Sequence, residues 1–184
     1  MAEKKENRRV RMTKRLMKEA LLDLMEQQDL VTISVTAICE TADVHRSTFY
    51  KYYTNPADLL REIEQDFLDR IPAPPQILDQ TNEKALLAAT TEFFDFVKEN
   101  KNAFRVLFNE SSGNSFTARL VDHLCSGYVP VGDDTDELSA RFTSLYIANG
   151  TVGMMREWVN EDFPISSQKI AEMMYYLSKK ISQY

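Results

Sequence analysis

The residues that carry the most chemical information lie in the run 46–52, Arg-Ser-Thr-Phe-Tyr-Lys-Tyr. An Arg guanidinium can form two parallel hydrogen bonds with guanine, and Ser or Thr hydroxyls can bond to several base edges. Lys and Tyr side chains suit phosphate oxygens, which hold a protein on a duplex without selecting a sequence. We therefore expect this run to contact duplex DNA through Arg46, Ser47, Thr48, Tyr50, Lys51 and Tyr52.

The elements that must position this run form a helix-turn-helix pattern. Ser34 can cap a short helix with an apolar side, and a tight turn at residues 43–44 leads into a second short helix over about residues 45–52. Phe49 would anchor the second helix in the core. In such a unit the second helix enters the major groove while the first crosses the backbone. The alternative is an ordinary amphipathic hairpin whose polar face meets only water.

Apolar residues recur at helical spacing along the rest of the chain, and strand patterns are nearly absent. Three prolines within residues 72–75 cannot continue a helix, so we place a division between two regions there. The sequence predicts an all-α fold of about nine helices. Its domains would be a helix-turn-helix DNA-binding domain (1–54), a connecting helix (55–71) and a C-terminal ligand-binding and dimerisation domain (72–184).

Charge is distributed unevenly along the chain. The formal net charge is −6, yet residues 1–18 carry eight Lys or Arg against two Glu, and residues 54–184 carry twelve basic against twenty acidic residues. A basic end on an acidic body is expected where that end meets an anion. A solvated tail is the alternative explanation.

The sequence shows no sign of an enzyme, a metal site or a cofactor. The two His and two Cys form no cluster with the spacing of metal ligands, and Gly-rich phosphate loops and nucleophile elbows are lacking. No apolar run approaches the roughly 18 residues of a membrane span, and the charged N-terminus is unlike a signal peptide. We therefore expect a cytoplasmic protein that has no cofactor and does not associate with membranes.

Residues 11–60 resemble the DNA-binding region of the tetracycline-repressor (TetR) family of bacterial transcription regulators. The matching positions are Thr32, Val35, Ile38, Ala42, Val44, Thr48, Phe49, Tyr50, Tyr52, Leu59 and Leu60. The resemblance implies a three-helix DNA-binding region, a six-helix regulatory region, and phosphate contacts near Thr32 and Thr36. It also implies that the basic arm, with Arg8, Arg9 and Arg11, can reach the neighbouring minor groove.

Four positions depart from the family pattern. Asp43 replaces the usual turn Gly, although Asp tolerates the left-handed conformation better than most residues. His45 replaces a Ser or Thr at the start of the recognition helix, Tyr53 replaces a Phe, and Pro56 replaces a Lys that contacts phosphate in the family. These departures motivate an alternative function: a protein of this fold that acts by protein contact and binds DNA weakly.

The last two expected helices carry apolar stripes that could form a dimer surface. A dimer gains by reading two half-sites about 34–36 Å apart, or a multiple of that distance. In the family these helices pack against their symmetry mates as a four-helix bundle, whereas the alternative places both stripes in the chain's own core. The expected interface residues are Leu138, Phe142, Leu145, Val152, Met155, Val159, Met173 and Leu177.

Aromatic and apolar side chains of the middle helices could enclose a ligand pocket, since pockets are mostly apolar with a few polar groups. The resemblance implies a homodimeric repressor that a small apolar or aromatic molecule, or a protein effector, releases from a palindromic operator. The alternatives are that these side chains form plain core, or that they serve a small-molecule-binding or enzymatic domain. The expected lining residues are Phe93, Phe104, Phe108, Phe116, Leu120, Tyr146, Asn149 and Trp158.

Overall fold

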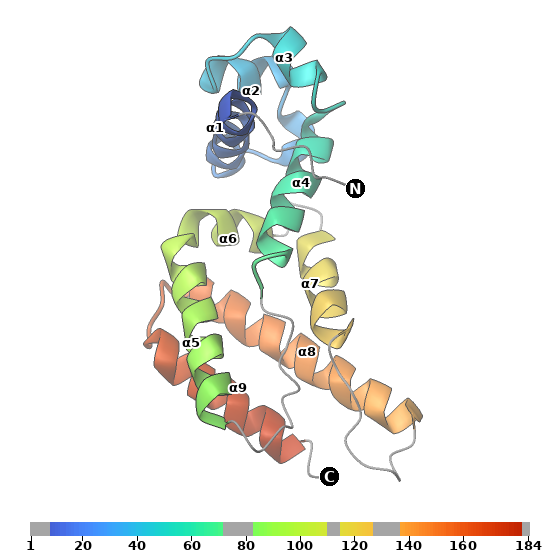
Figure 1. Ribbon diagram of the computed structural model, residues 1–184, viewed down its shortest axis with the longest axis vertical. Coiled ribbons are helices and arrows are strands. Elements are labelled where there is room, and N and C mark those ends of the chain that lie inside the picture. Colours follow the sequence, from blue (N-terminus) through green and yellow to red (C-terminus); the bar gives the residue numbers. More distant parts are fainter. Residues whose placement is uncertain (1–7, 72–82, 110–114, 127–136, 182–184) are drawn as a thin grey trace. The chain divides into compact units, whose positions relative to one another are not determined.

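A computed structural model of the chain describes residues 8–71, 83–109, 115–126 and 137–181. Within these ranges the regular structure is helical, with nine α-helices, one short 3-10 helix and no strand (Figure 1). The expected all-α fold is therefore confirmed. The chain divides into two compact units, Met1–Phe67 and Leu68–Tyr184. This division lies a few residues before the proline cluster at which we placed it.

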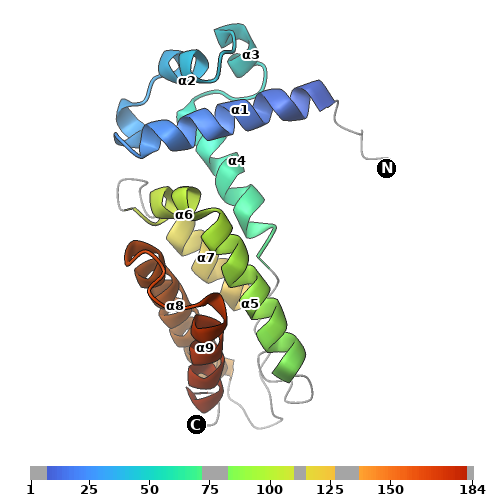
Figure 2. The ribbon, with the colours of Figure 1, turned by 90° about the vertical axis from the view of Figure 1, so that its left-hand side faces the viewer.

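The N-terminal unit contains α1 (Arg8–Met25), the 3-10 helix η1 (Leu30–Thr32), α2 (Val35–Thr41), α3 (Arg46–Tyr50) and most of α4 (Pro56–Leu68). Helix α1 is amphipathic and crosses beneath α2 and α3 (Figure 2). Its buried side and the facing sides of the other helices form one apolar core. The fully buried large side chains of this core are Met17, Leu21, Ile38, Phe49, Leu59 and Ile63.

Local hydrogen bonds fix the helix starts near the polar run. The hydroxyl of Ser34 accepts a hydrogen bond from the backbone N–H of Ala37 at 3.1 Å, as expected for an N-cap. Asn55 Oδ1 likewise accepts from the N–H of Asp58 at 2.9 Å, directly before α4. Pro56 occupies the first position of α4, where its missing N–H costs no hydrogen bond.

The C-terminal unit contains α5 (Glu83–Glu99), α6 (Lys101–Phe108), α7 (Ser115–Ser126), α8 (Glu137–Asn160) and α9 (Ser167–Ile181). Helix α5 packs along α9, and α7 packs along α8 (Figures 1 and 2). Buried aromatic and aliphatic side chains from all five helices fill the space between them. None of the described helices is both long enough and apolar enough to cross a membrane.

The turn between α8 and α9 is tightly held. Asp162 and Phe163 have φ angles of 55° and 63°, a left-handed conformation that non-glycine residues adopt uncommonly. The Phe163 ring packs edge-on against Trp158 with centroids 4.7 Å apart. Trp158 Nε1 donates a hydrogen bond to the carbonyl of Ile165 at 2.9 Å. These contacts stabilise the turn and so fix the start of α9 against the end of α8.

Candidate functional site

The turn between α2 and α3 has the geometry that a helix-turn-helix requires. Asp43 adopts the left-handed conformation with φ of 51°, which explains how it can replace the glycine usual in this turn. The next residue, Val44, donates its backbone N–H to the carbonyl of Cys39 at 2.9 Å. The turn therefore closes against the end of α2 and redirects the chain into α3.

Helix α3 is anchored by a single aromatic residue. Phe49 is completely buried, and its ring lies 5.8 Å from that of Tyr50 and 5.6 Å from that of Tyr53. The α-helix proper is shorter than the expected 45–52, because it ends at Tyr50. The backbone carbonyl of Phe49 nevertheless accepts hydrogen bonds from the backbone N–H groups of Tyr52 and Tyr53, both at 2.9 Å. A turn at residues 51–52 thus continues the direction of α3.

Around this anchor, α3 and its following turn present the predicted DNA-contacting side chains. Arg46, Ser47, Tyr50 and Lys51 are exposed, and Thr48 and Tyr52 are half-buried. His45, directly before the helix, makes no side-chain hydrogen bond that caps it. The structure therefore brings all six predicted residues of this run together on one short segment. This is the arrangement that a base-reading element needs.

Two ammonium groups lie near the ring of Tyr52. Lys51 Nζ is 5.5 Å and Lys14 Nζ is 5.6 Å from its centroid. Lys14 also pairs with Glu62 on α4 at 3.2 Å. Such cation–π contacts contribute about 0.5–1 kcal/mol at exposed sites, so they favour one position of the Tyr52 ring beside α3.

The other predicted DNA contacts are spread over the N-terminal unit. Thr32 and Thr36 are exposed, and the Thr32 hydroxyl donates to the carbonyl of Asp29 at 2.7 Å. Arg9 and Arg11 are exposed as well, but they lie in the first turn of α1. The residues expected to form a basic arm are thus part of a helix from Arg8 onward.

An ion cluster between α1 and α4 was not anticipated from the sequence. Lys18 Nζ lies 2.7 Å from Glu62 Oε1 and 2.6 Å from Asp66 Oδ2. Partial burial alone would raise the pKa of the Glu62 carboxyl, but hydrogen bonds and charges from Lys18 and Lys14 outweigh it and lower this pKa. Partial burial likewise opposes the charged form of Lys18, yet its carboxylate partners raise its pKa. The available signal was the four-residue spacing of the two cations and of the two anions on their helices.

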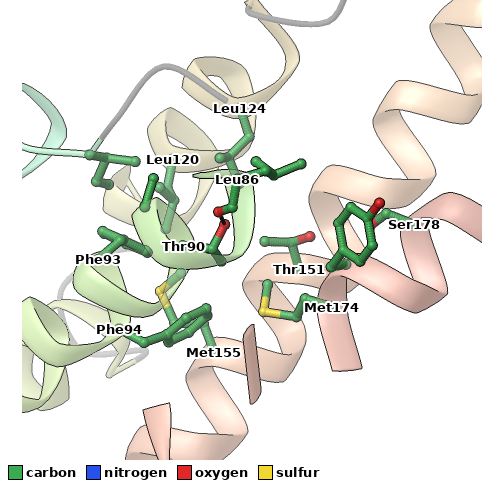
Figure 3. Close-up of a pocket in the computed structure, with 13 residues that line it drawn as sticks. Leu86, Thr90, Phe93, Phe94, Leu120, Leu124, Thr151, Met155, Met174 and Ser178 are labelled. Carbon is green, nitrogen blue, oxygen red and sulfur yellow. Dashed lines mark hydrogen bonds between the residues drawn. The ribbon is translucent and has the colours of Figure 1, made fainter. Parts of the chain in front are cut away.

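The C-terminal unit contains a cavity of about 100 Å³ between α5, α7, α8 and α9 (Figure 3). The cavity is partly open, and its lining, which includes Ile71, is almost wholly apolar. Of the eight predicted lining residues, this cavity has only Phe93 and Leu120. The lining residues are Ile71, Leu86, Ala89, Thr90, Phe93, Phe94, Leu120, Leu124, Thr151, Met155, Met174, Tyr175 and Ser178.

The other six predicted lining residues do not line this cavity. Phe104, Phe108 and Phe116 stack on one another with centroids 5.7–6.1 Å apart and form solid core. Trp158 packs against Phe94 and Phe163 and does not line the cavity. Two further residues, Tyr146 and Asn149, are exposed on α8.

The structure leaves only part of the expected dimer surface exposed. Leu138, Phe142, Leu145, Met173 and Leu177 are between 40% and 61% exposed, and an open groove runs along this face of α8 and α9. The structure instead buries three predicted interface residues inside the chain's own core, because they lie on the side of α8 that faces the other helices. These are Val152, Met155 and Val159.

The exposed face contains one large side chain that the prediction assigned to the pocket. Tyr146 is 67% exposed and borders the groove with Phe142. Gly150 borders the same groove, and a Cβ built there would meet no atom within 4 Å. Among the described residues no group of His, Cys, Asp and Glu could hold a metal ion.

Comparison with known proteins places this geometry in a family. The TetR-family model described as "Transcriptional regulator C-terminal region" matches residues 84–180. The HTH-type transcriptional regulator YxbF of Bacillus subtilis is 33% identical over 171 residues, covering 87% of this chain and 43% of that protein. The dhaKLM operon transcriptional activator DhaS of Lactococcus lactis is 32% identical over 97 residues, covering 52% and 49%. The chain therefore spans less than half the length of these curated relatives.

Solved structures share the fold over nearly the full chain. A TetR-family regulator from Syntrophomonas wolfei superposes with a TM-score of 0.68 at 14% identity, covering 95% of this chain and 96% of that one. A TetR regulator from Streptococcus agalactiae gives 0.67 at 18%, covering 93% and 96%. The activator DhaS gives 0.63 at 21%, covering 91% and 94%. Because the family model covers more than half of the sequence, the chain belongs to the TetR family of transcriptional regulators.

Proposed function

We propose that this protein is a DNA-binding regulator that reads a palindromic operator as a homodimer, with α3 in the major groove. The observation that carries the proposal is the exposed row of Arg46, Ser47 and Lys51 around the buried Phe49. Burial of Phe49 fixes the rotation of α3, so these polar groups point away from the core. Family membership supports the same assignment.

The side chains of this segment divide into two roles. Arg46 and Ser47, at the start of α3, would contact base edges and set the sequence preference, with Thr48 beside them. Lys51, Tyr50 and Tyr52 would contact phosphates, as would Thr32, Thr36, Arg9 and Arg11. Phosphate contacts release counterions, so binding should weaken as salt rises.

Homodimerisation through α8 and α9 would supply the second half-site reader. Phe142, Leu145, Tyr146 and Leu177 border one open groove along α8 and α9, and Leu138 and Met173 are exposed on the same two helices. Exposed apolar patches of this kind mark interaction sites. A two-fold contact would bury the same patch of both copies.

We further propose that the protein represses its target genes and that an effector bound by the C-terminal unit releases it from the operator. Such release requires that the effector bind the DNA-free conformation more tightly than the DNA-bound one. Activation is the second candidate, because the relative DhaS is named as the activator of the dhaKLM operon. A reporter gene behind the selected operator, with and without the protein, distinguishes the two signs of regulation.

Selection of random-sequence duplexes by the purified protein at two salt concentrations, followed by sequencing, tests the proposal. Enrichment of a palindrome with half-sites one helical turn or more apart is the expected result. Lys51→Ala should weaken binding to all duplexes. Lys101→Ala is its matched control and should leave binding unchanged, since Lys101 is an exposed lysine on α6 of the C-terminal unit. A folded dimer that enriches no sequence at low salt would favour action by protein contact instead.

A further inference from the structure

The cavity between α5, α7, α8 and α9 restricts the charge and the size of any molecule that could bind in it. We infer that it binds one small, uncharged and largely apolar molecule of about the size of benzene, and that Thr151 offers this molecule a single hydrogen bond. The assignment of the site stands on its geometry. Only its effect on DNA binding rests on the function proposed above.

The lining excludes charged ligands. None of the side chains that face the cavity is an ionisable acid or base of the Asp, Glu, Lys, Arg or His type. The rings of Phe93 and Phe94 and the side chains of Leu86 and Met155 form part of its apolar wall (Figure 3). A carboxylate, phosphate or ammonium group would lose its hydration there without gaining a partner, which is strongly unfavourable. Phosphorylated metabolites, amino acids and organic acids are therefore unsuited to this site.

The volume limits the size of the ligand. The cavity holds about 100 Å³, whereas pockets for drug-sized molecules usually have about 300–1,000 Å³. An engineered apolar cavity of about 150 Å³ in another protein stays dry and binds benzene or xenon. Met155 and Met174 both line the cavity, and their flexible side chains can adapt to a ring or a short branched chain.

The hydroxyl groups of the lining are not equally available. Thr90 Oγ1 already donates to the carbonyl of Leu86 at 2.8 Å. The Tyr175 hydroxyl accepts from Lys179 Nζ at 3.3 Å and so belongs to a charged cluster. Thr151, by contrast, makes no hydrogen bond within the described part of the chain, although it faces the cavity (Figure 3). A ligand with one hydroxyl or amine could bond to it.

The protein carries a natural reporter for occupancy. Trp158 is its single tryptophan, and its ring packs edge-on against Phe94 with centroids 5.3 Å apart. Phe94 lines the cavity. A ligand that shifts Phe94 should therefore change the fluorescence of Trp158, without any added label.

The test titrates the full chain with benzene, phenol, toluene and N-methylpyridinium, following Trp158 fluorescence and thermal unfolding. Toluene and N-methylpyridinium have the same shape and differ in charge. We expect saturable binding of the three neutral probes and at least tenfold weaker binding of the cation. Absence of saturable binding by every neutral probe, or equal binding of toluene and N-methylpyridinium, would overturn the inference.

Two variants locate the binding within this cavity. Ala89→Leu should fill it and weaken benzene binding at least tenfold, while Ala88→Leu, on the exposed side of the same helix, should leave it unchanged. Thr151→Val keeps the shape and removes the hydroxyl, so phenol should lose about threefold or more in affinity relative to benzene. If Thr151→Val leaves the ratio of phenol affinity to benzene affinity unchanged, the proposed hydrogen bond is refuted. This comparison remains decisive if Ala89→Leu fails to fold.

A separate measurement addresses the link to DNA. Binding of the selected operator is followed by fluorescence anisotropy with and without saturating benzene, and a change of fivefold or more is expected. If the protein binds no operator, the proposed function fails while the titrations still decide the ligand site. If operator binding is intact and benzene binds without changing it, the regulatory part of the inference is wrong.

Discussion

The ammonium group of Lys18 on α1 lies 2.7 Å from the carboxylate of Glu62 on α4. Asp66, one turn further along α4, lies 2.6 Å from the same ammonium. The two helices are far apart in sequence, and the side chain of Lys18 is only 17% exposed. This cluster therefore joins the first and last helices of the N-terminal unit, which precede and follow α2 and α3 in the sequence.

Glu62→Gln should lower the free energy of unfolding of the N-terminal unit by about 1 kcal/mol at pH 7, because it removes a partly screened ion pair. The effect should depend on pH. The folded-state pKa of Glu62 lies below its ordinary value of 4.5, so its contribution is full above that value and is lost as the pH falls through the folded-state pKa. Urea unfolding of the wild-type protein and the variant, from about pH 3 to about pH 7, measures the difference in unfolding free energy.

A matched control for this variant is Glu19→Gln. Glu19 lies 3.7 Å from Arg15 in an exposed pair on α1, with side chains more than half exposed. Such pairs contribute about 0.3–0.5 kcal/mol. If the two variants lose the same stability at pH 7, the cluster at Lys18 is no stronger than a surface ion pair.

Lys51→Ala and Arg46→Ala should affect DNA binding in different ways. Loss of the phosphate contact of Lys51 should weaken binding to all sequences and reduce the slope of log K against log salt by about 1. Loss of Arg46, or of Ser47, should relax the preference at particular positions of the operator, by about 1–3 kcal/mol per base pair. Anisotropy titrations with operator and scrambled duplexes separate these outcomes, and wild-type behaviour of all three variants would show that α3 does not read DNA.

Asp43→Gly should stabilise the N-terminal unit. The φ angle of 51° is unstrained for glycine and unfavourable for other residues. The gain should be about 0.5–1 kcal/mol, since the relief of strain exceeds the greater freedom of glycine in the unfolded chain. Asp43→Ala, which keeps a Cβ and loses the polar side chain, should destabilise instead. Thermal unfolding of both variants checks the opposite signs.

Phe142→Arg should separate the proposed dimer without unfolding the chain. Phe142 is 61% exposed in the single chain, so the change should alter its stability by no more than about 0.5 kcal/mol. Across a two-fold interface it would place like charges near each other and weaken dimerisation at least tenfold. Sedimentation velocity measures the assembly, and an unchanged dimer would show that this face is not the interface.

Val152→Ala is the counterpart on the other side of α8. Val152 is 3% exposed within one chain, and removing two methyl groups should cost about 1.5–2.5 kcal/mol of folding stability. The oligomeric state at temperatures below unfolding should not change. The pair of variants thus distinguishes the core side of α8 from its exposed side.

The sequence by itself determined the helices and the local arrangement of the segment that we propose reads DNA. Ser34 and Asn55 mark helix starts because each accepts a hydrogen bond from a backbone N–H three residues later, and both bonds form as expected. Pro56 marks the start of α4 through its fixed φ and missing N–H. The grouping of Arg46 to Tyr52 around Phe49 is equally local, because a short helix and turn keep the neighbouring residues together. Periodicity and capping are properties of consecutive residues, so they can be read before the chain folds.

Only the tertiary structure decided what each apolar side chain contacts. Helix α8 carries apolar residues on opposite sides, so spacing alone could not tell that Val152 faces the core and Phe142 does not. It also could not tell that Phe93 borders a cavity whereas Phe104 lies in solid core. These outcomes depend on how five helices meet, because burial is set by neighbours that are distant in sequence and an apolar residue suits a core, a cavity wall or an interface equally well.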